Sequence, residues 1–217
     1  MDINFFKKIR ILDGGMGQEI LARGMKPNGT LWSANALLKE KYHQLLLDTH
    51  LDFIKAGAEV IVTTTFTTRK IRLRDNSVED HFEYLNIKAG EIAQKAKKIY
   101  PKTLIAGGLP PQNLTYEADT RYDEEIRENF YSQAKILNPY VDFFYLDVLS
   151  SVRECKIAIK CIEEFNKPYL IGAHISEGTN LPSDEKISEI VTKINHKKLL
   201  GIILSCISPE NFELNIN

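Results

Sequence analysis

Acidic and thiol side chains in this sequence stand where short apolar runs end. Asp13 precedes two consecutive glycines, Gly14 and Gly15, Asp147 follows the aromatic run "FFYL", and Cys206 closes the run "LLGIILS". Adjacent glycines let backbone N–H groups approach a ligand closely, and a carboxylate beside them can orient a cation or a polar substrate. A cysteine thiolate is a nucleophile or a metal ligand. These residues are the first candidates for chemistry.

Each candidate also has an ordinary structural role. A Gly-Gly pair after a strand is more often a tight turn, and a single cysteine at a strand end is more often a core thiol. Asp147 is either the N-cap of the next helix or a ligand-binding acid, and the residues alone leave both interpretations open. We expect His174, inside an apolar run, to be a core histidine rather than a metal ligand. Cys155 and Cys161, on one amphipathic stretch, should also belong to the core.

The candidates are positioned by an alternation of apolar runs and helical patterns. Six runs, rich in β-branched and aromatic residues, predict strands at 9–12, 59–66, 103–109, 141–148, 168–176 and 199–206. They lack polar alternation, which is typical of strands buried on both faces in a parallel sheet. Helical spacing of apolar residues predicts helices over 37–56, 79–99, 123–137, 151–165 and 184–195. We expect Gly57 to end the first helix and Ser183–Asp184 to cap the last.

Repeated strand–helix alternation predicts a parallel α/β architecture, either an open doubly wound sheet or a barrel. In both, ligands bind at the C-terminal ends of the strands, where the candidates stand. No linker or repeat divides the sequence, so we expect a single domain over residues 1–217.

Composition excludes several classes of protein. The chain has 217 residues and a formal net charge of -1, which argues against a nucleic-acid-binding surface. Three cysteines do not make a disulfide scaffold, so we expect a reducing, cytoplasmic setting. The N-terminal "MDINFFKKIRIL" is no signal peptide, and no apolar run has the length needed to span a membrane.

Taken in order, these stretches resemble the homocysteine S-methyltransferase family. The matching stretches are "LDGGMGQEI" (12–20), "LW" (31–32), "HLDFIKAGAEVIVTTTF" (50–66), "AGGLPP" (106–111), "VDFFYLD" (141–147) followed by Glu154, and "CISPE" (206–210). The resemblance implies a (β/α)8 TIM-barrel type of fold, here incomplete with about six β/α units. It also implies methyl transfer from a methyl donor to the thiol of homocysteine, giving methionine in methionine biosynthesis, with zinc at the mouth of the barrel.

The resemblance assigns roles to particular residues. Cys206 matches the first of three zinc-binding cysteines. The positions implied to bind substrate are Asp13, Gly14 and Gly15 at the amino acid end, Thr65 and Phe66 in the pocket wall, and Asp147, which stands where the family usually has a glutamate that contacts the substrate's amino group.

The sequence also departs from the family pattern. We expect it to end before the seventh and eighth strands and the cysteine pair that completes the zinc site, and one thiolate does not hold a zinc ion. We therefore expect no zinc-dependent activity from this chain by itself. Further departures near the mouth are Thr64, Asp147, Val148, Asp184 and Ser205, where the family usually has asparagine, glutamate, threonine, glycine and asparagine.

Two other hypotheses stay open. One is a degenerate, non-catalytic relative that acts as an interaction module and self-associates through the open edge of the barrel. The other is an unrelated α/β-barrel enzyme that binds an anion at Gly14 and Gly15.

Overall fold

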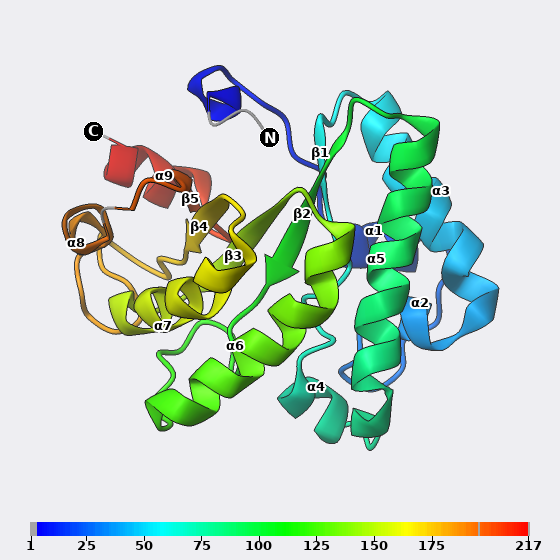
Figure 1. Cartoon of the computed structure of the whole chain (residues 1–217), viewed down its shortest axis with the longest axis horizontal. Coiled ribbons are helices and arrows are strands. Elements are labelled where there is room, and N and C mark those ends of the chain that lie inside the picture. Colours follow the sequence, from blue (N-terminus) through cyan, green and yellow to red (C-terminus); the bar gives the residue numbers. More distant parts are fainter. Residues whose placement is uncertain (1–3, 195, 217) are drawn as a thin grey trace.

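Five parallel strands form one sheet in the order β1-β2-β3-β4-β5 (Figure 1). This computed structural model describes residues 4–194 and 196–216. The strands are β1 Val60–Val62, β2 Leu104–Leu109, β3 Phe143–Leu149, β4 Tyr169–Ala173 and β5 Leu199–Leu204. Neighbours in space are neighbours in sequence, with no reversal of strand order. The sheet is therefore an arc of a (β/α) barrel and not a doubly wound sheet.

Helices connect the strands and cover the outside of the arc (Figure 1). They are α1 Met16–Ala22, α2 Ala34–Leu38, α3 His43–Lys55, α4 Lys70–Arg74, α5 Phe82–Ile99, α6 Asp123–Leu137, α7 Val152–Ile162, α8 Ile187–Lys193 and α9 Pro209–Ile216. Short 3-10 turns lie at Phe5–Lys7, Glu40–Tyr42, Glu79–His81, Asn138–Tyr140 and Glu163–Phe165. Successive helices pack on one another, α3 on α5, α5 on α6 and α6 on α7, as the strands do beneath them.

Alternate strand residues face opposite sides of the sheet and build two cores. On the helix-covered side Ile61, Ile105, Phe144, Leu146 and Ile171 pack with α5, α6 and α7. On the concave side Val60, Ala106, Phe143, Tyr145 and Leu170 form a smaller cluster. This two-sided burial explains why the strands read as continuous apolar runs.

The N-terminal segment covers the concave cluster. Phe5 and Phe6 pack against it, and the Phe6 ring meets the Phe143 ring edge-on at a centroid distance of 5.7 Å. Arg10 forms an ion pair with Glu59, with 2.7 Å between Arg10 Nη1 and Glu59 Oε1.

The prediction of a strand at 9–12 is wrong. In this stretch Leu12 makes an isolated parallel bridge to Val60, while Ile9 and Ile11 are exposed. The chain turns at Gly14 and Gly15 into α1, so the segment before them is too short to form a ladder of backbone hydrogen bonds with β1. The described residues thus form five strands, and Leu12 adds only a bridge beside β1 where a sixth strand was predicted.

Other element boundaries differ from the pattern-based ones in ways that matter for the site. The run 59–66 is a strand only over Val60–Val62, although the Thr63 backbone N–H still donates to the Ala106 carbonyl oxygen of β2 at 2.9 Å. The predicted helix 37–56 is broken at Lys39, and it ends as expected at Gly57, which has a φ of 113°. Helix α8 begins at Ile187 with Lys186 as its N-cap, so the predicted cap at Ser183–Asp184 is wrong. Residue 195, at the end of that prediction, lies outside the described residues.

The turn after β1 is held from below by a buried glutamine of α6. Gln133 Nε2 donates to the Thr65 carbonyl oxygen at 3.1 Å and lies 3.1 Å from Asn86 Oδ1. Its Oε1 accepts from Gln112 Nε2 at 3.0 Å. Buried polar groups linked in this way fix one arrangement, because breaking any link leaves a buried group unpaired. The loops after β1 and β2 are therefore held to the same helix.

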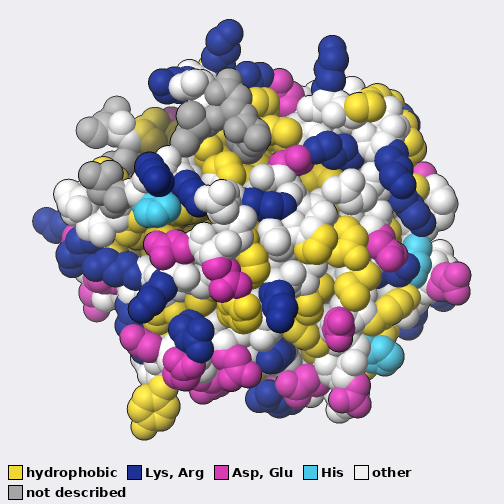
Figure 2. Space-filling view, in the orientation of Figure 1, with side chains coloured by type: hydrophobic (Ala, Val, Ile, Leu, Met, Phe, Trp, Pro, Cys, Tyr) yellow, Lys and Arg dark blue, Asp and Glu magenta, His cyan; other side chains and the backbone are white. Residues whose placement is uncertain are grey.

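The face of the molecule seen in Figure 2 carries charges of both signs. Figure 2 shows lysine and arginine side chains interspersed with aspartate and glutamate over the face displayed. No helix within the described ranges is long and apolar enough to cross a membrane.

Candidate functional site

A cavity of about 370 Å³ lies at the C-terminal ends of the strands. The positions that the resemblance implies to bind substrate or metal all line it, namely Asp13, Gly14, Gly15, Thr65, Phe66, Asp147 and Cys206. They come from segments up to about 190 positions apart along the chain and meet because parallel strands end at one edge of the sheet. The structure thus brings these residues together around one cavity, and their roles in binding are predictions.

Asp13 is a buried acid at the base of the cavity. Its side chain is 4% exposed, and its Oδ2 accepts a hydrogen bond from the Val62 backbone N–H at 3.0 Å. The pKa of Asp13 is raised to about 8, chiefly by burial; the Val62 hydrogen bond opposes the rise, and the nearby charge of Asp147 adds to it. The carboxyl group is therefore largely protonated at neutral pH until a cation reaches it.

His50 lies beneath Asp13 and does not supply that cation. Its Nδ1 is 3.7 Å from Asp13 Oδ2 and makes no hydrogen bond to the described residues. Complete burial lowers the pKa of His50 to about 4, so the ring is neutral at neutral pH. His50 was not singled out in the sequence, although its place on the buried face of a predicted helix was a usable signal.

Asp147 is a cavity acid and not a helix cap. Helix α7 is capped by Ser151, whose Oγ accepts from the Glu154 backbone N–H at 3.0 Å. The interpretation of Asp147 as an N-cap is therefore wrong. Burial raises the pKa of Asp147 to about 6, and a hydrogen bond with Tyr145 partly offsets that rise. Two carboxyl groups with raised pKa values thus face one cavity, which suits a cationic group of a ligand.

Left-handed backbone conformations gather around the cavity. Four lining residues other than glycine have positive φ: Trp32 (44°), Tyr116 (71°), Val148 (63°) and Cys206 (56°). Such conformations cost of order 1–3 kcal/mol each and persist where the surrounding structure imposes them. The strain is largest in principle for Val148, because its branched Cβ is crowded at positive φ. These positions are conformationally constrained in the way that binding sites often are.

An aromatic wall closes one side of the cavity. The rings of Trp32 and Phe66 meet edge-on at a centroid distance of 6.4 Å. The wall needs glycine beside it, because a Cβ on Gly17 would lie 2.3 Å from the Trp32 indole. Thr65 contributes shape rather than a free hydroxyl, since its Oγ1 donates to the Gly108 carbonyl oxygen at 2.6 Å.

Cys206 is the exposed thiol of the site, whereas Cys155 and Cys161 are buried as predicted. Tyr116 lines the same cavity, and its hydroxyl acts on the pKa of the Cys206 thiol. Burial raises the pKa of the Cys206 thiol above its ordinary value, and the Tyr116 contact opposes that rise. Tyr116 comes from the loop between β2 and α6, where the sequence has no periodic pattern to mark it.

The donor set does not amount to a zinc site. Across residues 4–194 and 196–216, no three His, Cys, Asp or Glu side chains are grouped to hold a metal ion. His174 is a buried histidine as predicted, because its Nδ1 bonds to the Ser205 carbonyl oxygen at 3.1 Å and its Nε2 to Ser176 Oγ at 2.8 Å. Cys206 alone does not fit zinc, which takes about three protein ligands.

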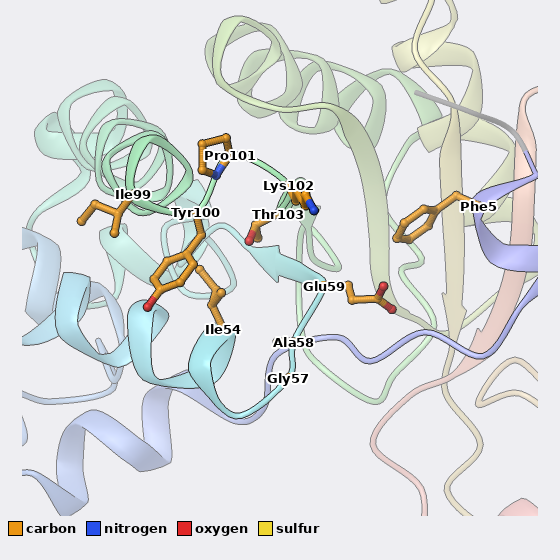
Figure 3. A pocket seen from close by; sticks show the side chains of 10 residues that line it. All are labelled: Phe5, Ile54, Gly57, Ala58, Glu59, Ile99, Tyr100, Pro101, Lys102 and Thr103. Atoms are coloured by element: carbon orange, nitrogen blue, oxygen red, sulfur yellow. The ribbon is translucent and has the colours of Figure 1, made fainter.

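A second cavity, of about 450 Å³, opens at the opposite end of the strands (Figure 3). Its lining includes Glu59, just before β1, and Thr103, just before β2. Glu59 is already paired with Arg10, and the wall is otherwise formed by Phe5, Ile54 and other largely apolar groups. Residues at this end of a barrel contribute chiefly to stability.

The buried acid makes a pH-dependent prediction for Asp13→Asn. Between pH 4 and 8 the folded protein keeps a proton on Asp13 that the unfolded chain has lost, so this group's stabilisation falls as pH rises, by at most about 1.4 kcal/mol per pH unit. Asparagine does not titrate. Relative to wild type, Asp13→Asn should therefore become steadily less destabilising from pH 5 to 8 in urea unfolding.

Asp48→Asn is the matched control, because Asp48 is exposed and bonds to Gln44 on the same helix. It should keep the wild-type pH dependence. Identical pH dependence in Asp13→Asn and wild type would contradict the raised pKa of Asp13.

Comparisons with known proteins agree with this geometry. A yeast (Saccharomyces cerevisiae) homocysteine S-methyltransferase 2 is 23% identical over 93% of this chain and 70% of its own length, and a maize (Zea mays) homocysteine S-methyltransferase 2 is 33% identical over 48% of this chain and 30% of its own. The crystal structure of the metallated homocysteine methyltransferase MmuM from Escherichia coli has the same fold, with a TM-score of 0.84 at 21% identity over 97% of this chain and 80% of that one. The chain thus spans only part of each relative. The family model for homocysteine S-methyltransferase matches residues 10–217, and the chain belongs to that family.

Proposed function

We propose that the cavity binds homocysteine as the acceptor of a methyl group, in a reaction that forms methionine. The observation that carries the proposal is the pairing of two carboxyl groups of raised pKa, Asp13 and Asp147, with the Cys206 thiol around one cavity. A homocysteine molecule has the complementary ends, an ammonium group and a thiol. Membership of the family supports the same reaction class.

The amino end is proposed to bind between the two acids. Asp147 raises the pKa of Asp13 because two negative charges in one cavity repel each other. A bound ammonium group removes that repulsion and favours the ionised form of both. Gly14 and Gly15, which follow Asp13, bring backbone rather than side chains to this end of the cavity.

The sulfur end is proposed to lie toward Cys206, along the aromatic wall of Trp32 and Phe66. In methyl transfer the homocysteine sulfur supplies the electron pair of the new S–CH3 bond, and the donor leaves with the electrons of the broken bond. The thiol proton must be lost before or during that step. The described residues are proposed to orient the acceptor and to shield it from water.

Zinc enters the proposal through a single residue of this chain. Cys206 is proposed to be the zinc-ligand position of this chain, and its single thiolate does not hold the metal by itself. No step above uses the metal. A cytoplasmic location and a place in methionine biosynthesis are further parts of the proposal, and they rest on the family and on cysteine usage.

Homocysteine binding tests the proposal through Asp147→Asn. Loss of a charge-assisted hydrogen bond to the ammonium group should weaken L-homocysteine binding about 10- to 100-fold in titration calorimetry. For the same reason 4-mercaptobutyrate, which lacks the amino group, should bind wild type much more weakly. Asp48→Asn, remote from the cavity, should bind L-homocysteine as wild type does. Equal binding of the two ligands, or an undiminished affinity in Asp147→Asn, would contradict the assignment.

A second candidate function follows from the edge of the sheet. Strand β5 pairs with β4, and no other described strand covers its far side. All six β5 residues are partly exposed, whereas β4 is buried throughout. We infer that this edge associates with a second copy of the chain.

Multi-angle light scattering tests the association. Wild type should show concentration-dependent dimers, and a charge on the edge, Ile202→Lys, should abolish them. Lys193→Glu, on the outer helix α8, is the control and should leave them unchanged. A strictly monomeric wild type at high concentration would contradict this candidate.

A further inference from the structure

A buried tyrosine lies between the two ends of the cavity. Tyr145, on the concave side of β3, is 8% exposed, and its hydroxyl oxygen is 2.7 Å from Ser205 Oγ. Asp147 is two residues further along β3 and lines the same cavity as Tyr145. Tyr145 thus stands beside the acid end of the cavity and bonds to the residue before Cys206.

Ser205 is held on three sides. Its backbone N–H donates to the Ala173 carbonyl oxygen at 2.8 Å, its carbonyl oxygen bonds to His174 Nδ1 at 3.1 Å, and its side chain bonds to Tyr145. The next residue, Cys206, has a φ of 56°. A non-glycine residue holds such a conformation only where its surroundings impose it. The contacts of Ser205 therefore determine the direction of the Cys206 thiol.

The Tyr145–Ser205 bond has room to form because residue 172 is a glycine. A Cβ on Gly172, on β4 between the two partners, would lie 2.6 Å from Ser205 Oγ and 2.8 Å from the Tyr145 ring. Any other residue would push the pair apart. The Tyr145–Ser205 bond is thus built into three adjacent strands rather than formed by a flexible surface pair.

We propose that Tyr145 is a positioning residue that sets the spacing between Asp147 and Cys206 and thereby selects the length of the amino acid. The inference rests on the proposed function, because it assumes an amino acid bound between these two groups. A ligand with one methylene fewer should bridge the two ends less well while the Tyr145–Ser205 bond holds them apart. Removing the hydroxyl frees the Ser205–Cys206 segment to move toward the shorter ligand.

Protection of Cys206 from iodoacetamide tests the inference without requiring metal or turnover. Cys155 and Cys161 are buried, and peptide mass spectrometry assigns the alkylation to Cys206. The probes are L-methionine and S-methyl-L-cysteine, which differ by one methylene and carry no thiol to consume the reagent. In wild type, L-methionine should protect at a concentration at least about tenfold lower, the discrimination that one methylene can give.

Tyr145→Phe keeps the ring and removes the hydrogen bond to Ser205. In this variant the protecting concentration of S-methyl-L-cysteine should lie within about twofold of that of L-methionine. Tyr169→Phe is the matched control, because Tyr169 is also buried, on the next strand, and its hydroxyl has no hydrogen-bond partner among the described residues. It should keep the wild-type ratio.

Ser205→Ala removes the same bond from the other side and should lower the ratio as Tyr145→Phe does, which keeps the test valid if Tyr145→Phe folds poorly. A general loosening would weaken protection by both probes equally and leave the ratio unchanged, and that result would overturn the inference. Absence of protection in wild type would overturn the proposed function and the inference together, whereas a wild-type ratio retained in both variants would overturn the inference alone.

Discussion

The carboxyl group of Asp13 occupies a buried position without a charged partner. A backbone N–H of Val62 holds one oxygen, the neighbouring His50 is neutral because it is buried too, and Asp147 faces the same cavity with a second acid. Burial and the charge of Asp147 disfavour a negative charge on Asp13, and the Val62 hydrogen bond opposes them. Asp13 is therefore protonated at neutral pH, and we expect it to ionise when a cationic group binds beside it. The rest of the fold serves to keep these groups together.

Three strands and their loops hold that arrangement. The turn after β1 carries the pocket wall and is fixed by Gln133 of α6, β3 brings Asp147, and β5 brings Cys206. Tyr145 joins the last two through Ser205. Strain in the backbone at Val148 and Cys206 is the cost of aiming both residues into the cavity.

Much of this could be predicted from the sequence, because a parallel α/β pattern places polar strand ends at one edge. Asp13, Asp147 and Cys206 were found that way, and the ordered motifs gave the family and barrel type that the comparisons confirm. Strand lengths could not be predicted, since the early end of β1 depends on a buried network made with α6. Nor could Tyr145 be distinguished from other aromatic strand residues, because its role depends on Ser205, 60 positions away.

Proton release on binding L-homocysteine to the metal-free protein tests the central claim most directly. Calorimetry at pH 7 in buffers of different ionisation enthalpy counts the protons. Asp13, with a pKa of about 8, is protonated in the free cavity and should ionise beside the bound ammonium group. We predict release of close to one proton in wild type and almost none in Asp13→Asn. Binding of L-homocysteine to wild type with no proton released would contradict the account.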